Sequence, residues 1–138
     1  MRGDNYMALD TIKQTWDSEF KGVMETPTGK INIGDTENGL APYHMLFGAL
    51  GACFYATFLS IAKKKRLTFD KATLEISGKK EEKEREPRLL EEAVMTLTIT
   101  NPSNEKGFTR SAELGADYCS IHKALEKIAH IELKVEFN

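Results

Sequence analysis

The sequence has few of the residues that mark disulfide-built or charge-driven proteins. Its 138 residues include two cysteines, four prolines and one tryptophan. Two cysteines are too few for the disulfide framework of a small secreted protein. Basic and acidic residues nearly balance, at 19 and 21, so the chain has no overall positive charge to bind nucleic acid or an anionic membrane. A chain of this length can bury a core without metals or disulfides, and we expect a single domain over residues 1–138.

The N-terminal stretch MRGDNYMALD has no apolar core of the kind that signal peptides carry. We therefore expect a cytoplasmic protein whose cysteines are reduced or redox-active. Residues 1–7 are expected to form a flexible extension outside the fold.

The most apolar segment is residues 45–62, which contain no charged residue and are followed by the basic cluster Lys63 to Arg66. At about 1.5 Å per residue, a helix over this segment would fall slightly short of the roughly 30 Å hydrocarbon core of a membrane. Glycine, serine and threonine within the segment also weaken the membrane interpretation. We expect a buried helix that starts near Pro42. Burial on all sides would require a second subunit, which indicates an intimate homodimer.

The remaining segments predict an α+β fold with the element order β-β-β-α-β-β-α-α-β. Apolar and polar residues alternate in 72–77, 93–99 and 131–137, as in half-buried strands, and the first two are expected to be neighbours. The charged residues 79–88 are typical of a solvated hairpin end. Strand-like segments at 9–16, 19–24 and 30–33 predict a meander, and helices are expected at 104–116, capped by Ser103, and at 120–129.

Both cysteines lie where thiol chemistry is plausible. Cys119 directly precedes a helix, where free N–H groups favour a thiolate, and His122 lies one turn later on the same face. Cys53 shares its helix with a stripe of small residues that would let another helix approach closely. The members of this stripe are Ala49, Ala52, Ala56 and Ser60. If the helix that carries Cys119 packed into this stripe, the two sulfurs would come within disulfide distance.

The segments GLAPYHMLFGALGAC (residues 39–53) and YCSIHKAL (residues 118–125) resemble the OsmC/Ohr family of osmotically induced and organic-hydroperoxide-resistance proteins. The resemblance extends from about Ala8 to Phe137. It implies an intertwined homodimer with two curved sheets around central helices and active sites at the subunit interface. It also implies that Cys53 attacks a peroxide and that Cys119 resolves the sulfenic acid as a disulfide, in the oxidative stress response.

One feature of the peroxidase subfamily is absent. That subfamily has a glutamate directly after the proline, and the glutamate holds an arginine over the reactive sulfur; here the position is Tyr43, followed by His44. The N-terminal meander offers lysines but no arginine, and a lysine does not replace a guanidinium group held by a carboxylate. His44 and His122 are therefore candidate activating groups, and Tyr43 and Phe54 are candidate lining groups.

Three classes of function fit these residues. The first is a thiol-dependent peroxidase for apolar organic hydroperoxides, which needs no cofactor but an external dithiol reductant; Phe47, Phe54, Tyr55 and Phe58 would line its site. The second is a non-catalytic protein that binds a small molecule and whose cysteines are reduced bystanders. The third is a zinc site made by Cys53, Cys119, His44 and His122. A single C-x-x-H is half of such a site, and we expect no metal.

Overall fold

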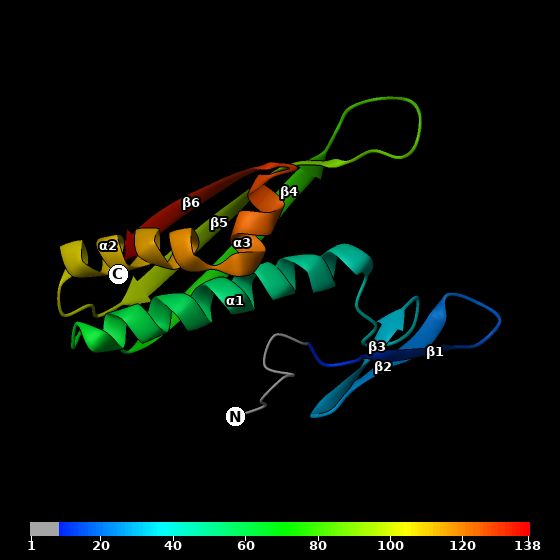
Figure 1. Ribbon diagram of the computed structural model, residues 1–138, viewed down its shortest axis with the longest axis horizontal. Helices are drawn as coiled ribbons and strands as arrows, with labels where there is room; N and C mark the ends of the chain where they lie inside the picture. The colour runs from blue at the N-terminus through cyan, green and yellow to red at the C-terminus, as the bar shows by residue number, and fades with distance from the viewer. Residues whose placement is uncertain (1–8) are drawn as a thin grey trace. The chain divides into compact units, whose positions relative to one another are not determined.

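The computed structural model describes residues 9–138, so the extension expected at residues 1–7 lies outside the described residues. The described chain divides into two compact units, residues 9–46 and residues 47–138. The elements are β1 (Lys13–Trp16), β2 (Lys21–Thr26), β3 (Gly29–Gly34), α1 (Pro42–Lys64), β4 (Lys71–Lys80), β5 (Leu90–Thr100), α2 (Glu105–Tyr118), α3 (Ser120–Glu126) and β6 (His130–Phe137) (Figure 1). This order and the α+β class confirm the prediction.

The first unit is the expected meander of three antiparallel strands, β1, β2 and β3. The rings of Trp16 and Phe20 stack with their centroids 5.2 Å apart. Gly34 ends the sheet with a φ of 89°, and a side chain there would collide with the carbonyl group of Phe20. The predicted first strand was too long, because residues 9–12 form no strand and their apolar side chains are exposed.

Helix α1 begins and ends with recognisable capping groups. Pro42 occupies the first helical position, where its missing N–H costs nothing. At the other end, Arg66 adopts a left-handed conformation with a φ of 59°. The N–H groups of Arg66 and Leu67 return to the carbonyl groups of Lys63 and Ala62, at 2.9 and 3.0 Å. This pair of bonds is a Schellman motif, which closes the helix directly after its basic residues.

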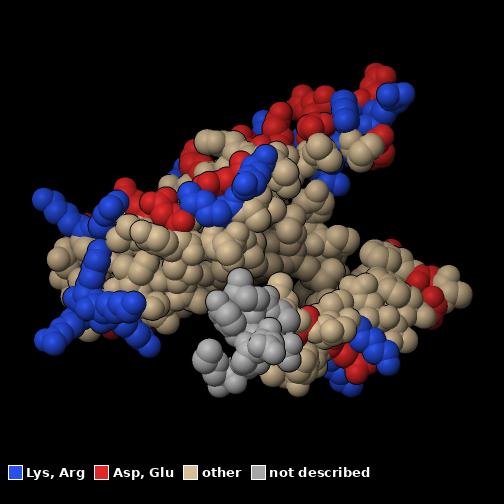
Figure 2. Space-filling view, viewed as in Figure 1, with Lys and Arg blue, Asp and Glu red and all other residues tan. Residues whose placement is uncertain are grey.

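The second unit is built on the sheet β4-β5-β6. β4 and β5 are antiparallel neighbours, as predicted, and β6 joins β5 in parallel. The alternation in β5 turns one face of the strand inward, and its residues Ala93, Met95, Leu97 and Ile99 are fully buried. The three helices lie on this side of the sheet, and the charged loop between β4 and β5 extends beyond it (Figure 1). Figure 2 shows acidic and basic side chains intermixed on that loop, as expected for a solvated hairpin end.

Helices α2 and α3 differ in their ends from the prediction. Asn104, not Ser103, caps α2 by accepting a hydrogen bond from the N–H of Gly107 at 3.0 Å. Ser103 instead accepts a bond from the N–H of Thr68, which ties the loop after α1 to the start of α2. Helix α2 runs on to Tyr118, and α3 ends at Glu126 rather than at residue 129.

Within one chain, α1 is buried along one face only. Its buried residues are Leu50, Gly51, Phe54, Phe58 and Ala62. By length and composition α1 also qualifies as a possible membrane span, with a mean hydropathy of 1.8, but core helices of soluble proteins pass the same test. Its packing against β4, where Gly51 meets Leu74 and Ile76, favours a core helix.

Candidate functional site

The two cysteines are free thiols that differ in exposure. Cys53 lies at the middle of α1 and is half-buried, whereas Cys119 is fully buried. Cys119 occupies the single-residue link between α2 and α3 and caps α3, accepting a hydrogen bond from the N–H of His122 at 3.4 Å. The linker geometry therefore fixes the Cys119 sulfur at the first turn of α3.

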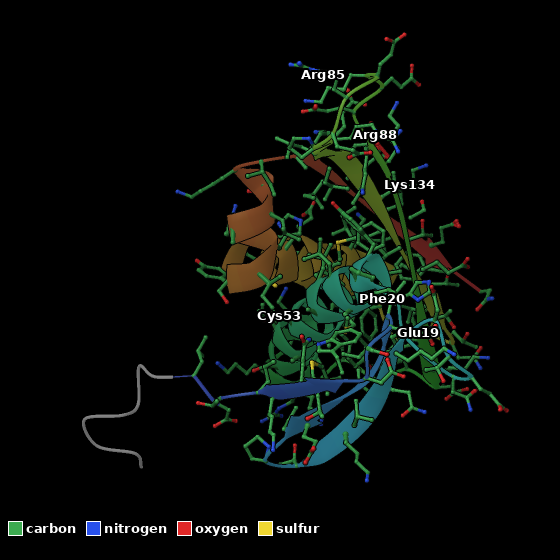
Figure 3. The ribbon with its side chains drawn as sticks, turned by 90° about the vertical axis from the view of Figure 1, so that its right-hand side faces the viewer. Glu19, Phe20, Cys53, Arg85, Arg88 and Lys134 are labelled. Carbon is green, nitrogen blue, oxygen red and sulfur yellow. The ribbon has the colours of Figure 1, made fainter. Side chains whose placement is uncertain are left out.

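The structure brings the two thiols together, as the sequence predicted. The thiol of Cys119 is hydrogen-bonded to Cys53, which lies on α1 beside the start of α3 (Figure 3). The packing that achieves this differs from the prediction. The helix at Cys119 does not pack into the stripe of Ala49, Ala52, Ala56 and Ser60, whose members are all exposed. Helix α2 packs on another face of α1, where Gly115 lies against the backbone of Phe58.

The environment separates the pKa values of the two thiols. Burial raises the pKa of Cys53, but hydrogen bonds outweigh this effect, the largest of them from Cys119, and the pKa lies below its ordinary value. Burial also raises the pKa of Cys119, and the hydrogen bond to Cys53 raises it further. The N–H of His122 offsets only part of this increase. Cys53 is therefore the more readily ionised thiol, although the helix-mouth position of Cys119 alone favoured the opposite order.

Ser120 and Ile121 also belong to the candidate site, and the sequence analysis missed them. Their backbone N–H groups donate hydrogen bonds to Cys53, and so does the Ser120 hydroxyl group. The N–H groups at the start of α3 thus act on both thiols, because those of Ser120 and Ile121 act on Cys53 and that of His122 acts on Cys119. The position of Ser120 next to Cys119 could have suggested a hydrogen-bond donor to a thiol. Which thiol it donates to depends on how α1 and α3 pack.

His44 acts as a helix cap, whereas Phe54 packs in the core. His44 lies in the first turn of α1, and its Nδ1 accepts a hydrogen bond from the N–H of Ala41 at 3.0 Å, which caps the helix. Tyr43 is half-buried in the same turn. Phe54 is fully buried and stacks on Phe58 with centroids 6.0 Å apart, so both belong to the core and do not line an open site.

His122 is buried, with 3% of its surface exposed, rather than on the helix surface. Its Nδ1 lies 3.0 Å from Oε1 of Glu126, one turn later on α3. The two groups are close but poorly aligned, so Nδ1 has no hydrogen-bond partner of good geometry. Burial lowers the pKa of His122, an effect that the Glu126 carboxylate only partly offsets. The imidazole is therefore predominantly neutral at pH 7.

Two open hollows lie along α1. One, of about 580 Å³, is lined by Ala56, Ser60, Ile61 and Lys64 together with Leu114 and Tyr118 of α2. The other, of about 460 Å³, is lined mainly by Phe47, Gly48, Ala52 and Tyr55 with Leu74 and Ile76 of β4. Neither lining includes a cysteine. Within residues 9–138 no three His, Cys, Asp or Glu side chains gather as a metal site would require.

Comparison of the chain with solved structures identifies proteins of the same fold. A hypothetical protein from Aquifex aeolicus is 24% identical, with a TM-score of 0.85 over 96% of this chain and 98% of that one. An OsmC-like protein from Mycoplasma pneumoniae is 18% identical, with a TM-score of 0.82 over 94% and 96% of the two chains. The organic hydroperoxide resistance protein OhrB of Bacillus subtilis is 14% identical, with a TM-score of 0.65 over 94% and 99%.

One of two sequence comparisons finds a match. A search of curated protein sequences finds no significant match. The family model for OsmC-like proteins matches residues 34–134, which include both cysteines and most of the described chain. The chain therefore belongs to the OsmC-like protein family.

Proposed function

We propose that this protein is a cysteine-based peroxidase that reduces organic hydroperoxides with Cys53 and Cys119. The observation that carries the proposal is the hydrogen-bonded pair of thiols in which the pKa of the half-buried Cys53 is lowered and that of the buried Cys119 is raised. A thiolate is the form that attacks a peroxide, and Cys53 is the thiol that combines ionisation with exposure. The name of the Bacillus subtilis protein supports hydroperoxides as the class of substrate.

The reaction proceeds in two steps. The Cys53 thiolate attacks one oxygen of the hydroperoxide, the O–O bond breaks, and the alkoxide leaves as an alcohol after it takes up a proton. Cys53 is then a sulfenic acid. The Cys119 sulfur attacks the Cys53 sulfur, the S–O bond breaks, and water leaves as the disulfide forms. An external dithiol reduces the disulfide and restores both thiols.

Activation of Cys53 does not depend on an arginine in this proposal. Two backbone N–H groups and a hydroxyl group from Ser120 and Ile121 stabilise the thiolate where a guanidinium group would act in the peroxidase subfamily. Neutral donors stabilise an anion less than a cation does, so we expect slower attack than in proteins that keep the arginine.

A second copy of the chain is expected to cover the exposed side of α1. The stripe of Ala49, Ala52, Ala56 and Ser60 is open in the single chain, and small residues allow close approach of another helix. The two hollows flank this stripe, and Phe47 and Tyr55 give one of them an apolar wall. In a homodimer these hollows would become enclosed and could receive an apolar hydroperoxide.

The test is a single-turnover reaction of the reduced protein with one equivalent of cumene hydroperoxide, followed by mass spectrometry of the cysteine peptides. We expect a Cys53–Cys119 disulfide in the native protein and a trapped sulfenic acid at Cys53 in Cys119→Ser. Cys53→Ser is the matched control and should consume no peroxide. Oxidation no faster than that of a free thiol in solution would refute the peroxidase proposal.

The alternative function is binding of a small molecule by a non-catalytic dimer. It is favoured by the position of the hollows, whose linings include neither cysteine. In that case the Cys53→Ser, Cys119→Ser double variant would bind an apolar ligand as tightly as the native protein in a fluorescence titration. Loss of binding in the double variant would instead place the ligand next to the thiols.

A further inference from the structure

The proposed function requires Cys119 to act as a nucleophile, but its environment disfavours the thiolate. Cys119 must lose its proton to attack the sulfenic acid, yet it is fully buried and its pKa is raised. A neutral thiol is a poor nucleophile, so a nearby base would speed the step. The base must lie within direct reach of the Cys119 sulfur, or within reach through one water molecule.

His122 is placed to be that base. Cys119 is the cap of α3 and His122 is three residues later, and the backbone N–H of His122 already donates to the Cys119 sulfur at 3.4 Å. Side chains three residues apart on a helix have Cβ atoms about 5–6 Å apart, a separation that an imidazole ring or one bridging water spans. Both side chains are buried, that of Cys119 at the cap of α3 and that of His122 in its first turn.

The carboxylate of Glu126 is the group that can orient the imidazole. This carboxylate lies 3.0 Å from Nδ1 of His122, and this nitrogen is buried. A carboxylate beside Nδ1 favours the tautomer that carries the proton there, which leaves Nε2 as the basic nitrogen. A cysteine, a histidine and a carboxylate follow one another along this segment, and these are the residue types that share the roles in enzymes with an activated cysteine.

Burial, rather than the charges around it, keeps His122 neutral and so able to accept a proton. Burial lowers its pKa, and Lys123 lowers it further. Glu126 on the same helix and Asp117 on α2 raise it, but do not reverse the effect of burial. The side chains of all three charged residues are more than a third exposed, which screens their effect on the imidazole.

We propose that His122, oriented by Glu126, is the general base that takes the proton from Cys119 when the disulfide closes. The inference builds on the proposed function. The proton passes from the Cys119 thiol to Nε2 of His122 as the S–S bond forms and the S–O bond of the sulfenic acid breaks. The imidazolium then gives this proton to the departing hydroxide, which leaves as water. The sulfur of Cys119 is oxidised and that of Cys53 is reduced, and the base returns to its neutral form.

The closing step can be measured without any peroxide. One equivalent of an aromatic disulfide that releases coloured nitrothiobenzoate is added to the reduced protein. Attack by Cys53 releases the first coloured thiolate and leaves a mixed disulfide. Attack by Cys119 on that mixed disulfide releases the second and forms the Cys53–Cys119 bond. The leaving group needs no proton, so the rate of the second release reports removal of the proton from Cys119.

In His122→Asn we expect the second release to slow about a hundredfold at pH 7, as is usual for loss of a general base. The deficit should shrink as the pH rises, because Cys119 then ionises without help. Glu126→Gln should slow the step about tenfold. The matched controls are His130→Asn and Glu113→Gln, which alter exposed residues and should leave the rates of both releases unchanged. The Cys119→Ser variant should give the first release only.

Two results would overturn the inference. One is a second release within twofold of the native rate across the whole pH range in both His122→Asn and His122→Gln. The other is an equal slowing of the first release, which would mean that the substitution disturbs the packing around Cys53. Peroxidase activity has no part in this assay, so failure of the proposed function would be seen separately, in the reaction with cumene hydroperoxide.

Discussion

At the residue scale, Ser120 acts on the reactive thiol through both its side chain and its backbone. Its hydroxyl group and its N–H both donate to Cys53, although it is adjacent to Cys119 in the chain. The same short segment thus provides one thiol, Cys119, and the donors for the other. A substitution at Ser120 that keeps the backbone should alter the chemistry of Cys53 and leave the fold intact, because the side chain is exposed.

Ser120→Ala should raise the pKa of Cys53 and slow its alkylation by iodoacetamide about fivefold at pH 7. The estimate follows from about 1 kcal/mol for one hydrogen bond. The measurement is the rate of alkylation against pH, with Cys119→Ser as the background so that one thiol is followed. Ser77→Ala, at an exposed position of β4, is the control and should leave the profile unchanged. An unchanged profile in Ser120→Ala would show that the Ser120 hydroxyl group does not lower the pKa of Cys53.

His122 should make the protein less stable in mild acid. Burial lowers its pKa in the folded state, so the unfolded chain binds more protons at pH values between the folded and the unfolded pKa. The stability that this residue contributes is complete above the unfolded pKa of about 6.5 and is lost as the pH falls below it. We expect urea unfolding to show a decline from pH 7 to pH 5 that is weaker in His122→Gln. A parallel decline in both proteins would assign the effect to other groups.

At the element scale, the meeting of the cysteines depends on how closely α2 approaches α1. A Cβ atom on Gly115 would lie 3.0 Å from Cβ and 3.1 Å from Cα of Phe58. Cys119 follows Gly115 by one turn, and Cys53 precedes Phe58 by about one and a half turns. Any side chain at Gly115 therefore pushes the two helices apart close to the thiol pair.

Gly115→Val should destabilise the protein by about 1–3 kcal/mol, the usual cost of overpacking a core. It should also slow formation of the Cys53–Cys119 disulfide by an oxidant, because the sulfurs would no longer meet. Chemical unfolding and quantitative thiol assays measure the two effects. The control is Gly29→Ala, where a Cβ atom meets nothing within 4 Å. Disulfide formation at the native rate in a destabilised Gly115→Val would contradict the link between helix packing and the thiol pair.

Elements in which apolar and polar residues alternate regularly were predictable from the sequence. The alternation of apolar residues located β4, β5 and β6 to within a few residues, because one face of each strand packs on the core. The donors to Cys53 were not predictable, since Ser120 and Cys53 are 67 residues apart and meet only through tertiary packing. The cap of α2 was also misassigned, because Ser103 and Asn104 are both good caps and their choice depends on contacts with Thr68.

At the scale of the whole molecule, the exposed side of α1 determines the expected assembly. A single chain leaves most of a helix with a mean hydropathy of 1.8 outside the buried core. Between Phe47 and Ile61 the exposed residues of this helix are all small, so another helix can approach its backbone closely. Family membership gives the fold of one chain, whereas the assembly follows from this uncovered surface and remains a prediction.

Light scattering at micromolar concentration should give twice the 15.5 kDa mass of one chain. Ala56→Lys should shift the protein towards the monomer, because it places a charge and a long side chain in the centre of the small-residue stripe. Ala56 is exposed in the single chain, so the substitution should leave the fold of one copy unchanged in circular dichroism. Thr73→Lys, at an exposed position of β4, is the control and should remain dimeric. A native protein of 15.5 kDa at this concentration would contradict the dimer, and with it the enclosure of the two hollows beside α1.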